Sequence, residues 1–214
     1  NACGKTTLLK MIAGLEEPDA DGTVSIGAKK PQDARIGYAF QNYADSLLPW
    51  KTAIDNVAFP LRLSGMSRNE ARTKTRRFLD NLGVDIPEGS FPYELSGGQQ
   101  QSIAILRTFN YLPDVFVLDE PFSSLDFQAR LEMQDRFLKI WHKNRRATIF
   151  VSHEIDEALY LCDRMIMLTK GPARIARVLK NDLPRPRKRE MLNDPYLLDL
   201  RREAIETFMQ EVPA

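Results

Sequence analysis

The sequence predicts an α/β fold with a mostly parallel sheet and a helical insertion. Short apolar strands at 34–40, 114–120 and 147–154 alternate with segments of helical periodicity, which is typical of a parallel sheet covered by helices. The stretch from Lys51 to about Asn110, between two of these strands, is patterned almost throughout as helix. Hydrophobic residues make up 43% and charged residues 28% of the 214, as expected for a packed globular protein.

Each expected element has a local reason. In chain order, we expect a helix at 4–15, strands at 22–27 and 34–40, helices within 51–110, a strand at 114–120, a helix at 125–144, a strand at 147–154, a strand pair at 164–179 and a helix at 195–211. Ser67 with Glu70 has the spacing of a capping box, and Gly83 ends that helix. We treat 1–214 as one domain, with a helical subdomain at about 51–110 and a C-terminal tail at about 182–214.

Composition excludes several classes of function. The formal net charge of +1 argues against nucleic acid as the main partner, and we expect the basic stretch 185–189 to be a solvated tail. No apolar run reaches the roughly 20 residues that a membrane-spanning helix needs. Cys3 and Cys162 lie far apart, so we expect free thiols in a reducing compartment rather than a disulfide.

The start of the chain, NACGKTTLLK, has the pattern of the end of a phosphate-binding P-loop. Backbone N–H groups of such a loop surround phosphate oxygens at a helix N-terminus, whose dipole favours anions. Lys5 is expected to reach the β- and γ-phosphates and the Thr6 hydroxyl to bind Mg²⁺. The remaining residues assigned to this loop are Asn1, Ala2, Cys3, Gly4 and Thr7, with Cys3 a spacer and not a nucleophile.

Two adjacent acids end a buried strand at VFVLDEP. Asp119 can hold Mg²⁺ through water, and Glu120 can polarise the water that attacks the γ-phosphate. Proton transfer of this kind contributes about 10²–10⁴-fold to a rate. A solvated strand end is the alternative for a lone acid, but a pair of acids following a P-loop favours catalysis.

With LSGGQ at 95–99, the chain resembles the nucleotide-binding subunit of an ATP-binding cassette (ABC) transporter. Elements in the order typical of that family extend over nearly the whole chain: GKTT, YAFQ, LSGGQ, VFVLDEP, SSLD and FVSHE. The resemblance implies a P-loop NTPase core of ABC type, with ATP and Mg²⁺ as cofactors.

The resemblance also implies roles for single residues. Gln41 would reach Mg²⁺ and the attacking water, His153 would contact the γ-phosphate, and Asp126 would lie in a loop at the dimer interface. A second anion site would be formed by Ser96, Gly97, Gly98 and Gln99. In the family, this site binds the γ-phosphate held by a second copy of the chain, so that a head-to-tail dimer encloses two ATP molecules.

The segment after Gln41 contains apolar residues that we expect to be partly exposed: Leu47, Leu48, Pro49 and Trp50. In the family, this region receives a membrane permease subunit; burial against the helical insertion is the alternative. LLPW with DLPRPR is most similar to importer subunits for nitrate, sulfonate, taurine or thiamine precursors. The implied location is peripheral, on the cytoplasmic face of the cell membrane, with a solute-binding protein as an indirect partner.

The chain departs from the family at its start. It lacks the strands before the P-loop, the aromatic residue that stacks on adenine and the leading P-loop glycine. We therefore expect 1–214 to be part of a longer chain and to bind ATP weakly by itself. Two alternatives remain: a soluble ABC-type ATPase acting on DNA or ribosomes, and an inactive fragment or non-catalytic interaction subunit.

Overall fold

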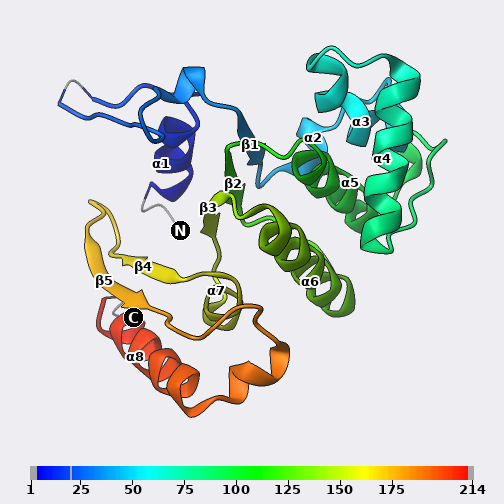
Figure 1. Ribbon diagram of the computed structural model, residues 1–214. Helices are drawn as coiled ribbons and strands as arrows, with labels where there is room; N and C mark the ends of the chain where they lie inside the picture. Colours follow the sequence, from blue (N-terminus) through cyan, green and yellow to red (C-terminus); the bar gives the residue numbers. More distant parts are fainter. Residues whose placement is uncertain (1–3, 20, 212–214) are drawn as a thin grey trace. The chain divides into compact units, whose positions relative to one another are not determined.

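The computed structural model describes residues 4–19 and 21–211, in two compact units (Figure 1). The first unit combines Asn1–Val24 with Phe150–Ala214, and the second is Ser25–Ile149.

The sheet of the second unit confirms the predicted α/β class. Strand β1 (Ile36–Ala39) pairs in parallel with β2 (Val115–Asp119), in the register Ile36↔Val115 to Ala39↔Leu118. Strand β3 (Ala147–Val151) is third in the order β1-β2-β3. Every residue of β2 is buried, which explains the apolar run at 115–118 before Asp119.

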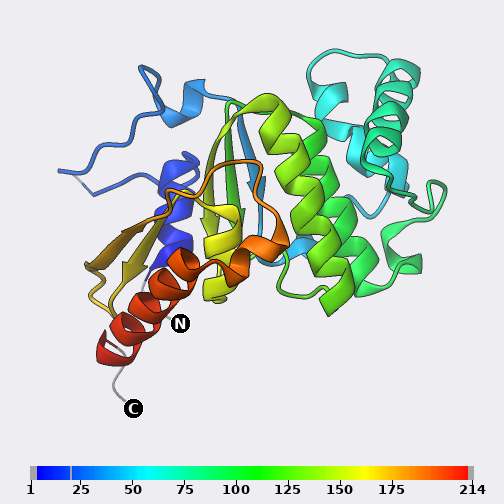
Figure 2. The same cartoon turned by 60° about the horizontal axis from the view of Figure 1, so that its bottom comes forward.

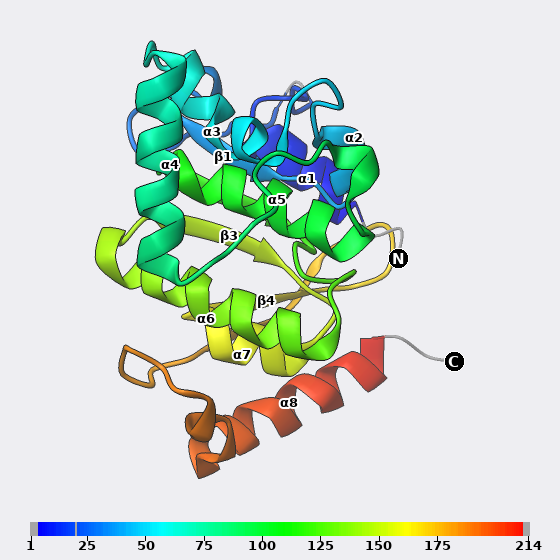
Figure 3. The same cartoon turned by 90° about the vertical axis from the view of Figure 1, so that its right-hand side faces the viewer.

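Helices fill the predicted insertion in the second unit. They are α3 (Ala53–Leu63), α4 (Arg68–Leu82) and α5 (Gly97–Asn110), and α3 packs against both α4 and α5 (Figure 3). The short helix α2 (Tyr43–Ser46) precedes the insertion. The Ser67–Glu70 capping box is present, and Gly83 ends α4 with the left-handed φ of 62° that glycine favours. Whether about 51–110 acts as a separate subdomain stays a prediction. After β2, α6 (Phe127–Asn144) completes this unit.

An ion-pair cluster joins α3 to α4. Asp55 accepts hydrogen bonds from Arg72 Nε at 2.6 Å and Arg72 Nη2 at 2.8 Å, and from Arg68 Nη2 at 2.6 Å. The Arg72 guanidinium, with help from Arg68, holds the pKa of the Asp55 carboxyl well below its usual range. This carboxylate therefore stabilises the folded state above its unfolded pKa of about 3.9, and the stabilisation is lost as the pH falls below that value.

We expect Asp55→Asn to lower the free energy of unfolding at pH 7 by about 1–3 kcal/mol, because hydrogen bonds to a charged partner are lost. The difference from the parent protein should shrink as the pH falls from 4 towards 2. Urea unfolding at a series of pH values measures both effects. Asp80→Asn, at an exposed position on α4, is the matched control; an equal loss in this control would contradict the assignment.

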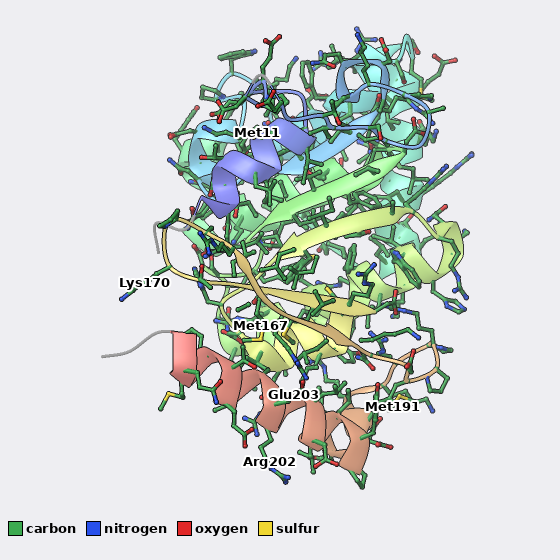
Figure 4. All side chains as sticks on the ribbon, turned by 90° about the vertical axis from the view of Figure 1, so that its left-hand side faces the viewer. Met11, Met167, Lys170, Met191, Arg202 and Glu203 are labelled. Atoms are coloured by element: carbon green, nitrogen blue, oxygen red, sulfur yellow. The ribbon has the colours of Figure 1, made fainter. Side chains whose placement is uncertain are left out.

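The first unit contains α1 (Lys5–Ile12), α7 (Ile155–Leu161), the antiparallel strands β4 (Arg164–Leu168) and β5 (Ile175–Lys180), and the terminal helix α8 (Pro195–Glu211). Helix α8 packs against α7 and β5, with Leu197 and Ala204 buried (Figure 2). Half-buried Glu203 forms an ion pair with Arg177 of β5, and exposed Arg202 forms one with Asp199 of the same helix. Figure 4 labels Glu203 and Arg202 on α8. The predicted final strand pair and terminal helix are confirmed.

Two expectations about local structure are wrong. The stretch 22–27 forms no strand: Ile26 makes only an isolated bridge to Lys29, because Gly27 turns the chain back with a φ of 61°. The basic stretch is not a solvated tail. The Arg187 side chain is buried and donates to the Cys162 carbonyl at 2.6 Å and to Asp163 at 3.0 Å. Its charge is therefore paired inside the protein and not exposed to water.

Across 4–19 and 21–211, the helices are all too short or too polar to span a bilayer.

Candidate functional site

The ends of two neighbouring strands bring together residues that separate motifs predicted. Gln41 follows β1 and Glu120 follows β2, and the carboxyl ends of parallel strands meet at one edge of the sheet. Gln41 Nε2 donates a hydrogen bond to Glu120 Oε2 at 3.2 Å. The two residues are 79 positions apart in the sequence. They meet because β1 and β2 pair in parallel, in a register that aligns the two strand ends.

The backbone at Glu120 is strained. Its φ of 48° lies in the left-handed region that non-glycine residues rarely occupy. The carbonyl of Glu120 accepts from Ser123 N at 3.2 Å and from Ser123 Oγ at 3.0 Å, and these bonds hold the turn. Strain of this kind persists where surrounding contacts over-determine it, and it is concentrated at functional sites.

Gln101 also holds this turn, and the motif analysis did not select it. Its side chain is 2% exposed, and its Nε2 donates to the Pro121 carbonyl at 2.7 Å. A buried glutamine in the second turn of α5 therefore fixes the residue next to Glu120. The sequence signal that could have identified this residue is a glutamine on the apolar side of a predicted helix.

The donor set at these strand ends fits Mg²⁺. Asp119 is buried at 1% exposure and Glu120 is half-buried. The Glu120 carboxylate accepts the hydrogen bond from the Gln41 amide. Within the described ranges, no group of three or more His, Cys, Asp and Glu side chains forms a complete metal cage. Mg²⁺ suits the observed arrangement because it usually takes one or two carboxylates and completes its shell with water and phosphate oxygens.

The P-loop end lies in the first unit, at the start of α1. Gly4 is the N-cap, with a φ of 82°. It provides no side-chain acceptor for the first-turn N–H groups, and that turn contains Lys5, Thr6 and Thr7 but no acid. This start of α1 fits a phosphate, since no acid in the first turn opposes the helix dipole. The predicted ligands Asn1, Ala2 and Cys3 lie outside the described residues.

His153 is exposed in the turn between β3 and α7, in the first unit. Ser152 Oγ accepts from Glu154 N at 2.9 Å, which bends the backbone around the histidine. The Ser152 hydroxyl also binds the Glu157 carboxylate. The structure thus places His153 at the tip of a fixed turn.

The predicted second anion site is the start of α5. Ser96 Oγ accepts from Gln99 N at 3.3 Å, and Ser96 N donates to Gln99 Oε1 at 2.9 Å, so the two side chains form a capping box. No acid lies in the first turn. A Cβ on Gly98 would meet nothing within 4 Å, so the backbone there is open to a ligand, whereas a Cβ on Gly97 would lie 3.0 Å from Tyr43 Oη.

Asp126 is the N-cap of α6, and its Oδ1 accepts from Ala129 N at 2.9 Å. The side chain is exposed. Asp126 therefore has a structural role in the single chain, and its predicted place at a dimer interface stays a prediction.

Comparisons with known proteins identify the family of the chain. The sequence profile described as "ABC transporter" matches residues 1–123. An uncharacterized ABC transporter ATP-binding protein of Methanocaldococcus jannaschii is 42% identical over 99% of this chain and 78% of its own length. A nitrate import ATP-binding protein of Synechococcus elongatus is 39% identical, with 96% of this chain and 76% of the relative covered. A taurine import ATP-binding protein of Rhizobium johnstonii is 37% identical over 95% of this chain and 79% of its own length.

A solved structure is also similar. It is the dimeric post-hydrolysis state of an ATP-binding cassette bound to ADP and phosphate, with a TM-score of 0.74 and 28% identity over 85% of this chain and 82% of that one. The family profile covers more than half of the chain, and the relatives align over nearly all of it. The chain therefore belongs to the ABC transporter family and is an ABC-type ATPase subunit.

Proposed function

We propose that this protein is the ATP-hydrolysing subunit of an importer for a small solute. The observation that carries the proposal is the hydrogen bond between Gln41 and Glu120 at the ends of adjacent parallel strands. A carboxylate and an amide in this position can share one water molecule, with Glu120 accepting its proton and Gln41 orienting it. The strained turn fixes Glu120 for this task.

The remaining residues would bind and neutralise the triphosphate. Lys5 and the first-turn N–H groups of α1 bind the β- and γ-phosphates, and His153 contacts the γ-phosphate. Thr6, Gln41 and Asp119 would hold Mg²⁺, directly or through water. The ion would supply positive charge to the phosphate oxygens during hydrolysis.

A second copy of the chain is the proposed partner across the nucleotide. The first turn of α5 contains no acid, and a Cβ at Gly98 would meet nothing within 4 Å. The backbone at Gly98 would therefore bind the γ-phosphate held by the other copy. A related cassette has been solved as a dimer with ADP and phosphate, which supports this arrangement.

ATP turnover at different protein concentrations tests the proposal. If two copies form each site, phosphate release by the protein expressed from its whole gene should rise with the square of protein concentration at low concentration. It should become linear once dimers predominate. A strictly linear dependence down to nanomolar protein would contradict the shared site, and no Mg²⁺-dependent turnover at all would contradict the enzyme.

The solute and the membrane partner are further parts of the proposal. Relatives named for nitrate and taurine import support a small solute of the nitrate, sulfonate, taurine or thiamine-precursor type. A membrane permease would dock near Leu47–Trp50, a solute-binding protein would act indirectly, and no nucleic acid would take part. The subunit would be peripheral on the cytoplasmic face of the membrane.

The exposure of this docking segment differs from the sequence expectation at one residue. Leu47 was expected to be partly exposed, but it is 4% exposed, because it anchors the segment in the core. Leu48 is half-buried, and Pro49 and Trp50 are exposed, with Trp50 at 70%. The docking surface therefore centres on Pro49 and Trp50.

We expect Trp50→Ala to abolish co-purification with the permease without lowering the melting temperature. An exposed aromatic side chain contributes little to folding, but as an interface anchor it can be worth 2 kcal/mol or more, about a thirtyfold loss of affinity. Pull-down of the permease from detergent-solubilised membranes measures the effect. Leu63→Ala, at 73% exposure on α3, is the control; retention of the permease by the Trp50 variant would contradict docking here.

A further inference from the structure

Gln101 is a polar residue on the buried side of α5. Its neighbours on that side, one turn further along the helix, are the buried apolar residues Ala104 and Ile105. Burial of a carboxamide is unfavourable unless its groups are hydrogen-bonded. Its Nε2 donates to the Pro121 carbonyl at 2.7 Å, whereas among the residues that the structure describes no donor meets its Oε1. This glutamine is therefore poorly suited to simple packing, and its bond is made to the turn after Glu120.

The Pro121 carbonyl sets the direction of that turn. The pyrrolidine ring locks the φ of a proline at about −65°, so ψ is the backbone torsion that remains free at this residue. The bond from Gln101 Nε2 fixes the orientation of the Pro121 carbonyl and with it ψ. Two constraints of different origin, a ring and a buried side chain, therefore determine the path of the backbone that leaves Glu120.

Glu120 needs such constraints because its backbone conformation is unfavourable for two reasons. Its φ of 48° is left-handed, and a residue that precedes a proline prefers an extended conformation. The bonds from Ser123 to the Glu120 carbonyl lie within the turn, so they hold its shape but do not tie it to another element. The bond from Gln101 ties the turn to α5.

Helix α5 is a suitable anchor because it is fixed to the strand that leads to Gln41. It packs against β1 and α3, and Thr108 Oγ1 donates to the Tyr38 carbonyl of β1 at 3.3 Å. Gln101 and Thr108 lie about two turns apart on this helix. Gln101 thus holds the Glu120 turn relative to β1 and to Gln41, whose Nε2 lies 3.2 Å from Glu120 Oε2.

We propose that Gln101 is a positioning residue for hydrolysis, which acts through the Pro121 carbonyl to keep the Glu120 carboxylate in place beside Gln41. This inference rests on the proposed function, which makes Glu120 the group that accepts a proton from water. A displacement of about 1 Å at a catalytic group can lower a rate about 10²-fold. The loss of one buried bond that orients the turn is therefore expected to affect the rate of hydrolysis.

Gln101→Met tests this role, because it keeps the approximate size of the side chain and removes the donor. We expect kcat to fall about ten- to hundredfold, while the affinity for ATP stays within about threefold of the parent value. The variants are made in the protein expressed from its whole gene. Phosphate release is measured at protein concentrations where turnover per molecule is constant, and equilibrium dialysis measures ATP affinity.

A double-mutant cycle with Glu120→Gln separates positioning from a general effect on the site. If Gln101 acts through the Glu120 carboxylate, Gln101→Met should change the residual rate of the Glu120→Gln variant by less than about twofold. Single-turnover hydrolysis of radiolabelled ATP measures this low rate. A residue that only supports the fold would lower both rates by the same factor.

Amide hydrogen exchange reports on the turn without nucleotide. The Ser123 amide donates to the Glu120 carbonyl at 3.2 Å, so its exchange reports how often the turn opens. We expect this amide to exchange about tenfold faster in Gln101→Met than in the parent protein. If Gln101→Met does not fold, Gln101→Leu also removes the donor and carries the same predictions.

Gln134→Met is the matched control. Gln134 is another buried glutamine, 3% exposed on α6. Its replacement should leave kcat within about twofold of the parent value, even where it lowers the melting temperature. It should also leave the exchange of the Ser123 amide unchanged. An equal loss of kcat in this control would overturn the specific role of Gln101.

The outcomes separate this inference from the proposed function. Parent-like kcat or parent-like Ser123 exchange in the folded Gln101→Met variant would overturn the positioning role and leave Glu120 as the base. Equal losses in the parent and Glu120→Gln backgrounds would do the same. Parent-like turnover by Glu120→Gln itself would instead contradict Glu120 as the base, and the role of Gln101 would be overturned with it.

Discussion

Glu120→Gln is expected to reduce ATP hydrolysis about 10²–10⁴-fold, while ATP still binds. The carboxamide that replaces the carboxylate has nearly the same shape, and its oxygen can still accept the hydrogen bond from Gln41 Nε2. The φ of 48° and the bonds from Ser123 belong to the backbone, so they should persist. What is lost is the group that accepts a proton from water.

Phosphate release under saturating ATP, with equilibrium dialysis for ATP affinity, measures the two effects separately. Glu132→Gln, at an exposed glutamate on α6, makes the same chemical change away from the strand ends and should leave turnover within about twofold, because surface substitutions usually cost little. A Glu120 variant that keeps more than a tenth of the parent rate would show that another group is the base.

Gly98→Asp should lower turnover about 10²–10³-fold without lowering stability, the magnitude that follows removal of an oxyanion-binding donor. The site has room, since a Cβ there meets nothing within 4 Å and its φ lies outside the left-handed region. A carboxylate in the first turn of α5 interacts favourably with the helix dipole, so the fold is not weakened. The same charge repels a phosphate that approaches this backbone.

Gly89→Asp is the matched control for this charge. Gly89 lies in an exposed loop of the same unit, and its Cβ position is equally open. Thermal melting and the concentration dependence of phosphate release should be measured on both variants. Loss of turnover only in the Gly98 variant, together with failure of ATP to dimerise it, is the expected pattern. Equal turnover in the two variants would contradict a phosphate at the start of α5.

The local elements of the fold could be predicted because their causes are local. The Ser67–Glu70 capping box and the left-handed stop at Gly83 depend on residues within one turn of each other. The apolar run that ends at Asp119 is continuous because β2 is buried on both faces. The expected strand at 22–27 failed for a reason that pattern alone does not reveal: Gly27 takes a positive φ and ends the extended conformation.

Residue types at the candidate site could likewise be selected from the sequence, since each motif carries its own chemistry. GKTT places a cation and a hydroxyl at a helix start, and VFVLDE places two acids at a strand end. Contacts between motifs could not be selected in this way. Gln101 looked like an ordinary helix residue, and its significance comes from the Pro121 backbone group that it meets.

By itself, the sequence determined the α/β class, the order of the motifs and the chemical groups available for phosphate binding and hydrolysis, because these depend on periodicity and residue type over short spans. Only the tertiary structure decided that Gln41 meets Glu120, that Leu47 is buried while Trp50 is exposed, and that Arg187 packs inside its unit. Such contacts depend on strand register and on which neighbour removes a side chain from water. Both are set by residues far apart in the chain.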